Sequence, residues 1–450
     1  MDIVYVVTVI WLFMLGACLG SFLNVCIYRL PRHEGVWQAW GTLLYPPSHC
    51  PKCQSPIRSY DNLPIFGWLL LRGRCRDCHL KISWRYPAIE LLTALIFVGL
   101  YLCEVYPPGT WQLSTLYQDY GPFPVHGTLW WSGPGLPNWR YGFHMVLVIA
   151  LIAATFIDFD LMIIPDSVTR PATIVGLLGN CIVGQFYLVP VWYSHPRGLT
   201  ARDIFRMFSP ANGPPSWIPP SLWEAITFTG VPQWVTAHPH WHGLAVSLAG
   251  IGVGALIVWI VRVVGFWSLN REAMGDGDIY LLAMVGAFLG WQATVVVFFL
   301  APFLALLVTV LMLPFKRSHE IPYGPYLSAA TLLLMAGWKW IYPPFEQGML
   351  SLGVFLPVVV LVMVPSMAGL LILSKWILRR LGVEYVDEPL VEWLPADQLA
   401  YLAGEQVDQQ QGRWPAELWP GARAGRGQEP QHVWRSGLPG GAWRAWQQRK

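Results

Sequence analysis

Runs of about 20 predominantly apolar residues recur along most of this 450-residue chain and restrict its fold more than any other feature. A helix that crosses a bilayer needs such a length, because its backbone must satisfy its own hydrogen bonds inside the hydrocarbon. The runs that qualify, or nearly so, are 3–25, 87–106, 142–157, 169–190, 243–265, 279–291, 293–314, 325–342 and 349–374. They predict an all-α polytopic membrane protein with about 8–9 transmembrane helices, two of which meet in a tight turn at Gly290 and Trp291.

Composition agrees with a lipid bilayer as the main partner. Only 12% of the residues are charged, against about 25% in soluble domains, and 54% are hydrophobic. The net charge of +3 is too small to indicate nucleic acid as a partner. No Lys or Arg precedes the first run, whereas Arg29 and Arg32 follow it. A secretory signal has the opposite layout, so we expect a retained first helix rather than a cleaved leader or lipidation at Cys18.

The basic residues of the short loops predict the orientation, since such residues accumulate on the cytoplasmic side. Alternating spans place three basic segments on one side, namely 29–86, 315–323 and 375–380. The predicted N-terminus is then periplasmic, and the C-terminal tail is cytoplasmic. The expected parts are a first helix (1–28), a cytoplasmic loop domain (29–86), a catalytic bundle (87–342) with outer loops 107–141 and 191–241, an extra helix (343–380) and a largely disordered tail rich in Gly, Pro, Gln and Arg (381–450).

Four cysteines in the polar loop have the spacing of a metal site. Cys50-Pro-Lys-Cys53 and Cys75-Arg-Asp-Cys78 are two Cys-x-x-Cys pairs 21 residues apart. Four thiolates form the closed tetrahedral site of structural zinc, and disulfides rarely persist in the cytoplasm. We therefore expect a four-cysteine zinc site that folds this small cytoplasmic insertion. The alternatives are four free thiols, or two disulfides if the topology is inverted.

Carboxylates at membrane depth are costly and indicate functional sites. Asp158 lies at the predicted cytoplasmic end of the third span, and Asp278 lies at the cytoplasmic start of the sixth. Two such carboxyls can share one proton, activate water and polarise an amide carbonyl, so we expect them to be the catalytic pair of an aspartyl peptidase. Gly275 and Gly277 would allow a tight turn and close passage of a substrate strand.

Other readings of these acids stay open. Asp278 is also a suitable helix N-cap. For Asp160, Asp166 and Asp276 we expect a solvated, interfacial position.

Three histidines alternate at the end of the second outer loop: His238, His240 and His242. Alternation would place them on one face of an extended segment, where they could bind a metal, although a solvated or interfacial loop is favoured.

The residues around these sites give the chain a resemblance to type IV prepilin leader peptidases, the bacterial branch of the GxGD intramembrane aspartyl proteases. The segments that carry it are 20–31 (GSFLNVCIYRLP), 60–75 (YDNLPI through LRGRC), 83–94 (SWRYP through ELLTA), the two aspartate motifs and 321–325 (IPYGP). By motif position, Asp158 and Asp278 match the two catalytic aspartates of the family. Tyr280 departs from the lysine that is usual there, and Asp276 adds an acid to the motif.

The resemblance implies an inner-membrane enzyme that removes the basic leader of prepilins or type II secretion pseudopilins after a glycine. It also implies methylation of the new N-terminus with S-adenosylmethionine, for which the sequence itself has no nucleotide-binding fingerprint. Two other classes of function remain as alternatives. One is a transporter or proton relay that uses the intramembrane carboxylates, and the other is a non-catalytic zinc scaffold that docks membrane components.

Overall fold

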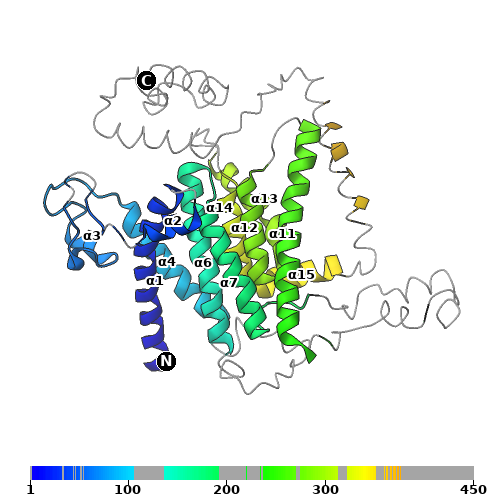
Figure 1. The fold of residues 1–450 in the computed structure, drawn as a ribbon, viewed down its shortest axis with the longest axis horizontal. Helices are drawn as coiled ribbons and strands as arrows, with labels where there is room; N and C mark the ends of the chain where they lie inside the picture. Colours follow the sequence, from blue (N-terminus) through cyan, green and yellow to red (C-terminus); the bar gives the residue numbers. More distant parts are fainter. Residues whose placement is uncertain are drawn as a thin grey trace.

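The structure is a computed structural model that describes residues 3–32, 35–105, 136–191, 237–269, 274–312 and 322–350, apart from residues 44, 46, 51, 52 and 54, together with a few single positions between 219 and 376. The longer helices are α1 (Ile3–Arg29), α4 (Arg85–Glu104), α6 (Leu136–Leu161), α7 (Asp166–Val183), α11 (Pro239–Leu269), α12 (Asp276–Leu289), α13 (Trp291–Met312), α14 (Gly324–Ala336) and α15 (Trp338–Leu350). Most of them lie side by side in one bundle (Figure 1). Within the described residues the only β-type pairing is two isolated bridges, so the predicted all-α class is confirmed.

Five of these helices are long and apolar enough to cross a membrane: α1, α4, α6, α11 and α13. The expected 8–9 spans are therefore not confirmed. α12 has 14 residues and α14 has 13, so each rises only about 20 Å, less than the hydrocarbon core. The run 325–342 breaks at Gly337 into α14 and α15. Most of the predicted last span (349–374), most of the outer loops 107–141 and 191–241 and all of the tail (381–450) lie outside the described residues.

The bundle is held together by close helix contacts at small residues. A side chain on Gly250 of α11 or on Gly286 of α12 would clash with the backbone of the other helix. Gly254 meets the backbone of Leu282 in the same way. In a bilayer the association of helices depends on such close packing, because lipid is as apolar as the helix surface. The glycines therefore fix the position of α12 against α11.

A buried amide adds hydrogen bonds to this packing. Asn180 of α7 is fully buried, and its side-chain NH₂ group donates to the Ser247 hydroxyl at 3.0 Å and to the Ala287 carbonyl oxygen at 2.9 Å. Ser247 donates to the same carbonyl at 2.7 Å. Ala287 precedes the end of α12 at Gly290, whose φ of +85° makes the tight turn predicted from the sequence. The contacts of Asn180 join α7, α11 and α12 into one unit.

The segment between α1 and α4 forms a small loop domain, defined here as residues 35–84. It contains the short helices α2 (Val36–Gly41) and α3 (Phe66–Leu70), and in Figure 1 it lies beside the bundle. Arg29 at the end of α1 donates to the Thr42 carbonyl oxygen at 2.6 Å, and Trp40 of α2 donates to the Ser167 carbonyl oxygen at 2.8 Å. We call the face of the bundle where α1 ends and α4 begins the loop side. By chain direction, α6 ends there and α7, α12 and α14 begin there.

Candidate active site and metal site

Asp158 and Asp278 lie close enough to interact electrostatically, although they belong to helices far apart along the chain. Asp158 is 5% exposed in the last turn of α6, and Asp278 is 8% exposed in the first turn of α12. α6 ends where Met162 takes a positive φ of 55°. The chain then turns through Pro165 into α7. The structure thus brings together the two carboxylates that the sequence singled out.

Each carboxylate accepts a backbone N–H from the start of a helix. The Gly275 N–H, at the N-cap of α12, bonds the Asp278 carboxylate, three residues further on. The Gly324 N–H, in the first turn of α14, bonds the Asp158 carboxylate. Helix N-termini carry partial positive charge, worth about 0.3–1 kcal/mol to a nearby anion and more when partly buried. Two helix dipoles therefore stabilise negative charge on this pair.

Gly324 and Tyr323 are site residues that sequence reasoning did not assign to the site. A Cβ on Gly324 would collide with the Asp158 carboxylate and lie 3.0 Å from the Ile164 side chain. Tyr323 interacts electrostatically with Asp278. Both belong to the segment 321–325 that contributed to the family resemblance. That match was the available signal, but only the structure shows that Gly324 lies against Asp158 and that Tyr323 interacts electrostatically with Asp278.

The glycines of the second aspartate motif lie at the start of α12. Gly275 has an ordinary extended conformation (φ −78°, ψ 160°), and Gly277 is not among the residues with positive φ. A Cβ on Gly277 would lie 2.9 Å from the Cβ of Ile164. The absence of a side chain at Gly277 therefore allows α12 to approach the loop after Asp158. The Asp278 N–H donates to the Gly275 carbonyl oxygen at 3.3 Å, so the chain turns here without positive φ at either glycine, and close passage of a substrate strand stays a prediction.

The three acids expected to be interfacial all pair with arginines. Asp160 accepts two hydrogen bonds of 2.7 Å from Arg85 at the start of α4. Asp166 pairs with Arg170, and Asp276 pairs with Arg262, while Asp276 keeps 67% of its side chain exposed. The Arg170 guanidinium lies 6.0 Å from the centroid of the Tyr280 ring, which leaves a cation near the position where the family usually has lysine.

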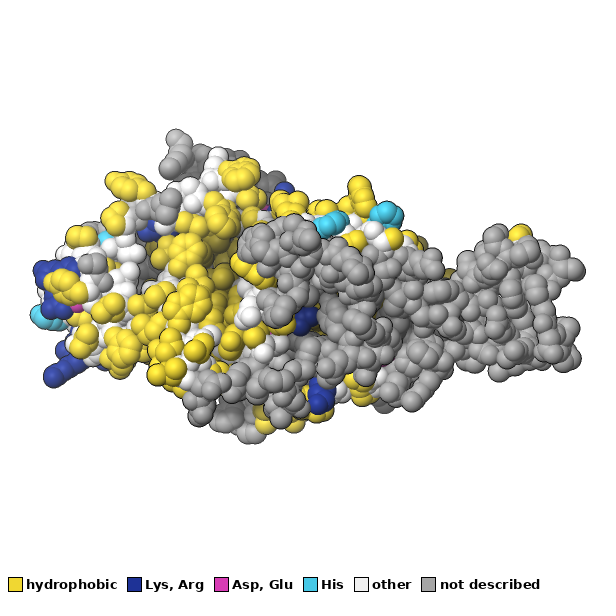
Figure 2. All heavy atoms as spheres, turned by 90° about the horizontal axis from the view of Figure 1, so that it is seen from below, with side chains coloured by type: hydrophobic (Ala, Val, Ile, Leu, Met, Phe, Trp, Pro, Cys, Tyr) yellow, Lys and Arg dark blue, Asp and Glu magenta, His cyan; other side chains and the backbone are white. Residues whose placement is uncertain are grey.

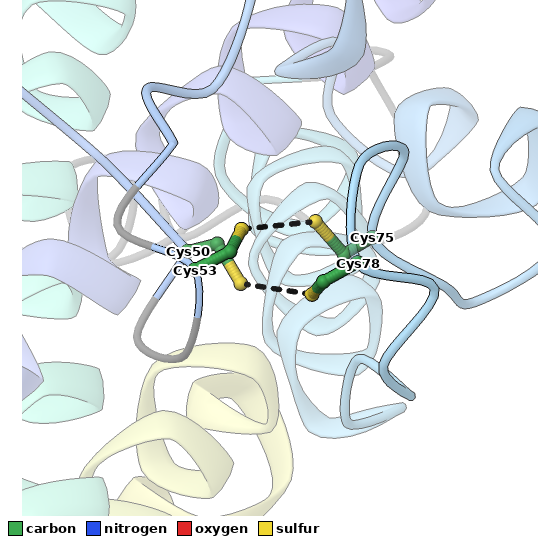
Figure 3. Close-up of side chains that lie close together, drawn as sticks. All are labelled: Cys50, Cys53, Cys75 and Cys78. Carbon is green, nitrogen blue, oxygen red and sulfur yellow. Dashed lines mark hydrogen bonds between the residues drawn. The ribbon is translucent and has the colours of Figure 1, made fainter.

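The sulfur atoms of Cys50, Cys53, Cys75 and Cys78 all lie within 4.8 Å of one another, which confirms the predicted cluster. The two pairs come from separate loops and face each other (Figure 3). Cys50 and Cys78 are 3.8 Å apart, and Cys53 and Cys75 are 4.0 Å apart. A tetrahedral zinc ion with Zn–S bonds of about 2.3 Å needs sulfurs about 3.8 Å apart, so this geometry fits such an ion.

The surrounding backbone supports the cluster. The N–H of Cys50 donates to the Ser55 carbonyl oxygen at 3.0 Å, and that of Cys75 donates to the Leu80 carbonyl oxygen at 2.8 Å, so each pair sits on a tight hairpin turn. Hydrogen bonds from the side chain and backbone of Ser55 lower the pKa of Cys53 to about 6, which favours the thiolate that binds a metal. Elsewhere in the described part of the chain, no group of three or more His, Cys, Asp or Glu side chains could hold a metal ion.

An ion pair shapes the same loop. Arg76 donates two hydrogen bonds to the Asp61 carboxylate, at 2.8 and 2.5 Å. Hydrogen bonding to Arg76 lowers the pKa of Asp61 below its ordinary value. The contribution of this pair to stability is therefore present at neutral pH and is lost as pH falls through the lowered pKa.

The expected extended segment at the three alternating histidines is wrong. The described residues here start α11, so His238 and His242 are one turn apart and His240 lies on another face. His242 is fully buried, and its Nε2 accepts the Val191 N–H at 3.1 Å. His240 donates to the Cys181 carbonyl oxygen at 3.1 Å. His242 and His240 thus join the start of α11 to the segments at Val191 and Cys181, while His238 and His240 remain exposed.

A bundle with five helices long and apolar enough to cross a membrane, which brings two buried carboxylates together at helix ends, has the features of an intramembrane aspartyl peptidase. Residues 14–103 match the bacterial peptidase A24 N-terminal domain, and residues 215–310 match the type IV leader peptidase family. The chain belongs to the prepilin leader peptidase/N-methyltransferase family.

Relatives with that name carry the family assignment. The protein from Aeromonas hydrophila is 30% identical over 350 residues, which are 72% of this chain and 87% of the relative. The protein from Myxococcus xanthus (strain DK1622) is 31% identical over 304 residues, which are 68% of this chain and 63% of the relative. The protein from Neisseria gonorrhoeae is 28% identical over 348 residues, 72% of this chain and 87% of the relative. No solved structure matches the chain.

Proposed function

We propose that this chain is a membrane-embedded aspartyl endopeptidase that removes the basic leader of type IV prepilins or type II secretion pseudopilins. Cleavage follows a glycine at the cytoplasmic membrane face, and Asp158 and Asp278 are the catalytic residues. The observation that carries the proposal is the electrostatic interaction between these two buried carboxylates at the ends of α6 and α12. The names of the relatives support the substrate class.

The pair has the chemistry that amide hydrolysis needs. Two adjacent buried carboxyls share one proton, because like charges at short range resist double ionisation. The ionised member takes a proton from water, whose oxygen attacks the scissile carbonyl carbon, and the protonated member donates a hydrogen bond to the carbonyl oxygen. The C–N bond of the tetrahedral intermediate then breaks, and the leaving nitrogen takes the proton that the first carboxylate accepted from water. The two groups titrate as a unit, so neither is assigned a fixed role. The N–H groups of Gly275 and Gly324 orient the carboxylates.

The remaining parts of the proposal rest on the family and on the loop. N-methylation of the new N-terminus is a second activity, supported by the relatives' names, and it requires S-adenosylmethionine as methyl donor. The four cysteines hold a structural zinc ion that stabilises the loop domain. The protein lies in the inner membrane with a periplasmic N-terminus, and the loop domain and C-terminal tail lie in the cytoplasm.

Co-expression with a prepilin tests the activity. The substrate carries a basic leader followed by Gly and Phe at the junction, and mass spectrometry follows its N-terminus. We expect loss of the leader after Gly and the added mass of one methyl group. Cleavage without the methyl group would remove the second activity from the proposal. Failure to cleave a panel of prepilins and pseudopilins would contradict the peptidase activity and favour a transporter or a zinc scaffold.

Gly324→Ala should reduce cleavage about 100-fold while the protein still inserts and folds. The new methyl group meets the Asp158 carboxylate, and a misplacement of about 1 Å can cost that much in rate. The measurement is the rate of leader removal in membranes with equal amounts of protein. Gly252→Ala is the matched control, because a Cβ there meets nothing within 4 Å. Equal rates for the two variants would contradict the assigned contact.

Arg85 is a positioning residue in this proposal. It holds Asp160, two residues after Asp158, through a two-point contact, and it also donates to the Phe156 carbonyl oxygen at 3.4 Å. Arg85→Lys loses the planar two-point contact, so we expect kcat to fall about tenfold with little change in KM. Thermal stability should change little, since partly exposed ion pairs contribute about 0–1 kcal/mol.

Two further variants test this role. Arg58→Gln is the control, because its carboxylate contact is loose at 4.0 Å. The double exchange Arg85→Asp with Asp160→Arg should restore part of the lost rate. A KM effect without a kcat effect would mean that Arg85 binds substrate instead.

A further inference from the structure

The loop domain exposes apolar side chains in an ordered pattern. Phe66, Leu69 and Leu70 of α3 are 52%, 54% and 73% exposed, and their spacing places them on one helix face. Gly67 lies on the opposite side of α3, buried against the Asp61 carbonyl oxygen. We call Phe66, Leu69 and Leu70 the apolar loop face. Trp84, 73% exposed, immediately precedes the membrane-spanning helix α4.

The apolar loop face has a fixed orientation relative to the bundle. Ile65 has a positive φ of 63° in a tight turn closed by the Phe66 N–H and the Pro64 carbonyl oxygen at 2.6 Å. Its own N–H donates to the buried Glu90 carboxylate of α4 at 2.6 Å. Trp68 of α3 donates to the Ile82 carbonyl oxygen at 3.1 Å. A β-branched residue is held in this strained conformation only by its surroundings, so α3 is tied to a transmembrane helix.

Several exposed cations lie in the same domain. Its aspartates are both occupied, Asp61 by Arg76 and Asp77, more loosely, by Arg58. Arg72, Arg74 and Lys81 have no carboxylate partner among the described residues. Arg74 and Lys81 also face each other across an isolated antiparallel bridge, where like charges destabilise the pairing. An external anion at this position would relieve that repulsion.

The position of the domain indicates what lies against it. In Figure 1 the loop domain extends sideways from the bundle, beside the C-terminal part of α1. Figure 2 shows the lower side of the molecule: hydrophobic side chains cover much of it, and Lys and Arg side chains lie at its outer edge. Apolar side chains beside cations are the features that bind a segment to the surface of an anionic bilayer.

We propose that the loop domain docks on the surface of the bilayer in which the protein is embedded. Phe66, Leu69 and Leu70 enter the boundary between headgroups and acyl chains, and Arg72, Arg74 and Lys81 bind the phosphates of anionic phospholipids. A basic prepilin leader does not fit this surface, because the same cations repel it. The domain would thereby be held at a fixed depth beside the loop side of the bundle, where the catalytic pair lies.

The first experiment measures depth in the full-length protein. A fluorescent amino acid is incorporated at position 70 in place of Leu70, and the protein is reconstituted in nanodiscs of mixed phosphatidylglycerol and phosphatidylcholine. Phospholipids brominated on the acyl chain should quench the probe at least about twofold more than aqueous iodide does. Stronger quenching by iodide than by the brominated lipids would overturn the proposal. Because fluorescence is independent of peptidase activity, this outcome is separable from failure of the proposed function.

The second experiment measures the contribution of charge. With the same probe, quenching by brominated lipid is compared between anionic discs and pure phosphatidylcholine discs. The additional quenching in anionic discs should disappear in a triple variant that carries Arg72→Gln, Arg74→Gln and Lys81→Gln. Lys339→Gln, in α15, is the control and should leave this additional quenching unchanged. When the three cations are retained, high salt should reduce the additional quenching that anionic discs give.

A third experiment identifies what the apolar loop face touches. A photo-crosslinking amino acid at position 70 should give phospholipid adducts. Adducts only to co-reconstituted prepilin or to a second copy of the chain would overturn the membrane assignment.

Discussion

Asp158→Asn and Asp278→Asn should each reduce leader cleavage by about 10²–10⁴-fold while the protein inserts in normal amounts. Loss of one carboxyl removes the shared proton, so water is no longer activated opposite a protonated partner. Asparagine has nearly the same shape as aspartate, and it removes a charge from a buried pair, so unfolding should not become easier. The measurement is the rate of leader removal by mass spectrometry, together with thermal stability in detergent.

The matched control for this prediction is Asp276→Asn. Asp276 lies in the same first turn of α12, but its side chain is 67% exposed and pairs with Arg262. Its loss should change the rate by less than about threefold, since exposed ion pairs contribute about 0–1 kcal/mol. Wild-type cleavage by either buried variant would reject the catalytic pair. Equal loss in all three variants would point to general damage of the α12 terminus.

Removal of the metal should unfold the loop domain and leave the bundle intact. Binding of structural zinc by four thiolates contributes about 10–16 kcal/mol in zinc-finger peptides, and that free energy is largely folding energy. The loop domain has little regular secondary structure: within its described residues it forms two short helices, one 3-10 helix and two isolated bridges. We expect about one zinc per chain by elemental analysis, and rapid proteolysis between residues 35 and 84 after chelation or in Cys50→Ser and Cys75→Ser.

Cys103→Ser is the control for the zinc prediction, because Cys103 lies in α4 outside the cluster. It should keep both the metal and the resistance to protease. Readdition of zinc to chelated protein should restore resistance, whereas magnesium should not, since thiolates favour zinc. A protein that contains no metal and yet resists proteolysis of the loop would contradict a structural zinc ion.

Some features of this protein follow from the chain alone because they are local. Apolar runs predicted most of the helices, since length and hydropathy are properties of one segment. The paired Cys-x-x-Cys spacing predicted a cluster that the structure contains. Gly290 predicted the turn between α12 and α13, because positive φ suits glycine. Asp158 and Asp278 were predicted to be functional because acids at membrane depth are energetically costly, and their catalytic role remains a prediction.

Contacts between distant segments could not be predicted in this way. Glu104 and His144 form a fully enclosed pair at 2.8 Å between α4 and α6, and the sequence of neither segment indicates that the two side chains meet. The alternation of His238, His240 and His242 suggested an extended strand, but helix formation in α11 and burial of His242 overrode it. The predicted 8–9 spans are not confirmed: among the described residues five helices are long and apolar enough to cross a membrane, and hydropathy alone does not distinguish a full span from the short helices α12 and α14.

The sequence by itself determined the chemical inventory of this protein: apolar helices, two acids at membrane depth and four cysteines with metal-ligand spacing. Only the tertiary structure decided how that inventory is assembled. Close packing at glycine fixes α12 against α11, and the start of α14 places the Gly324 N–H on Asp158. The physical reason is that a carboxylate's electrostatic environment depends on which helix ends surround it, and those ends are brought together by packing between segments far apart in the chain.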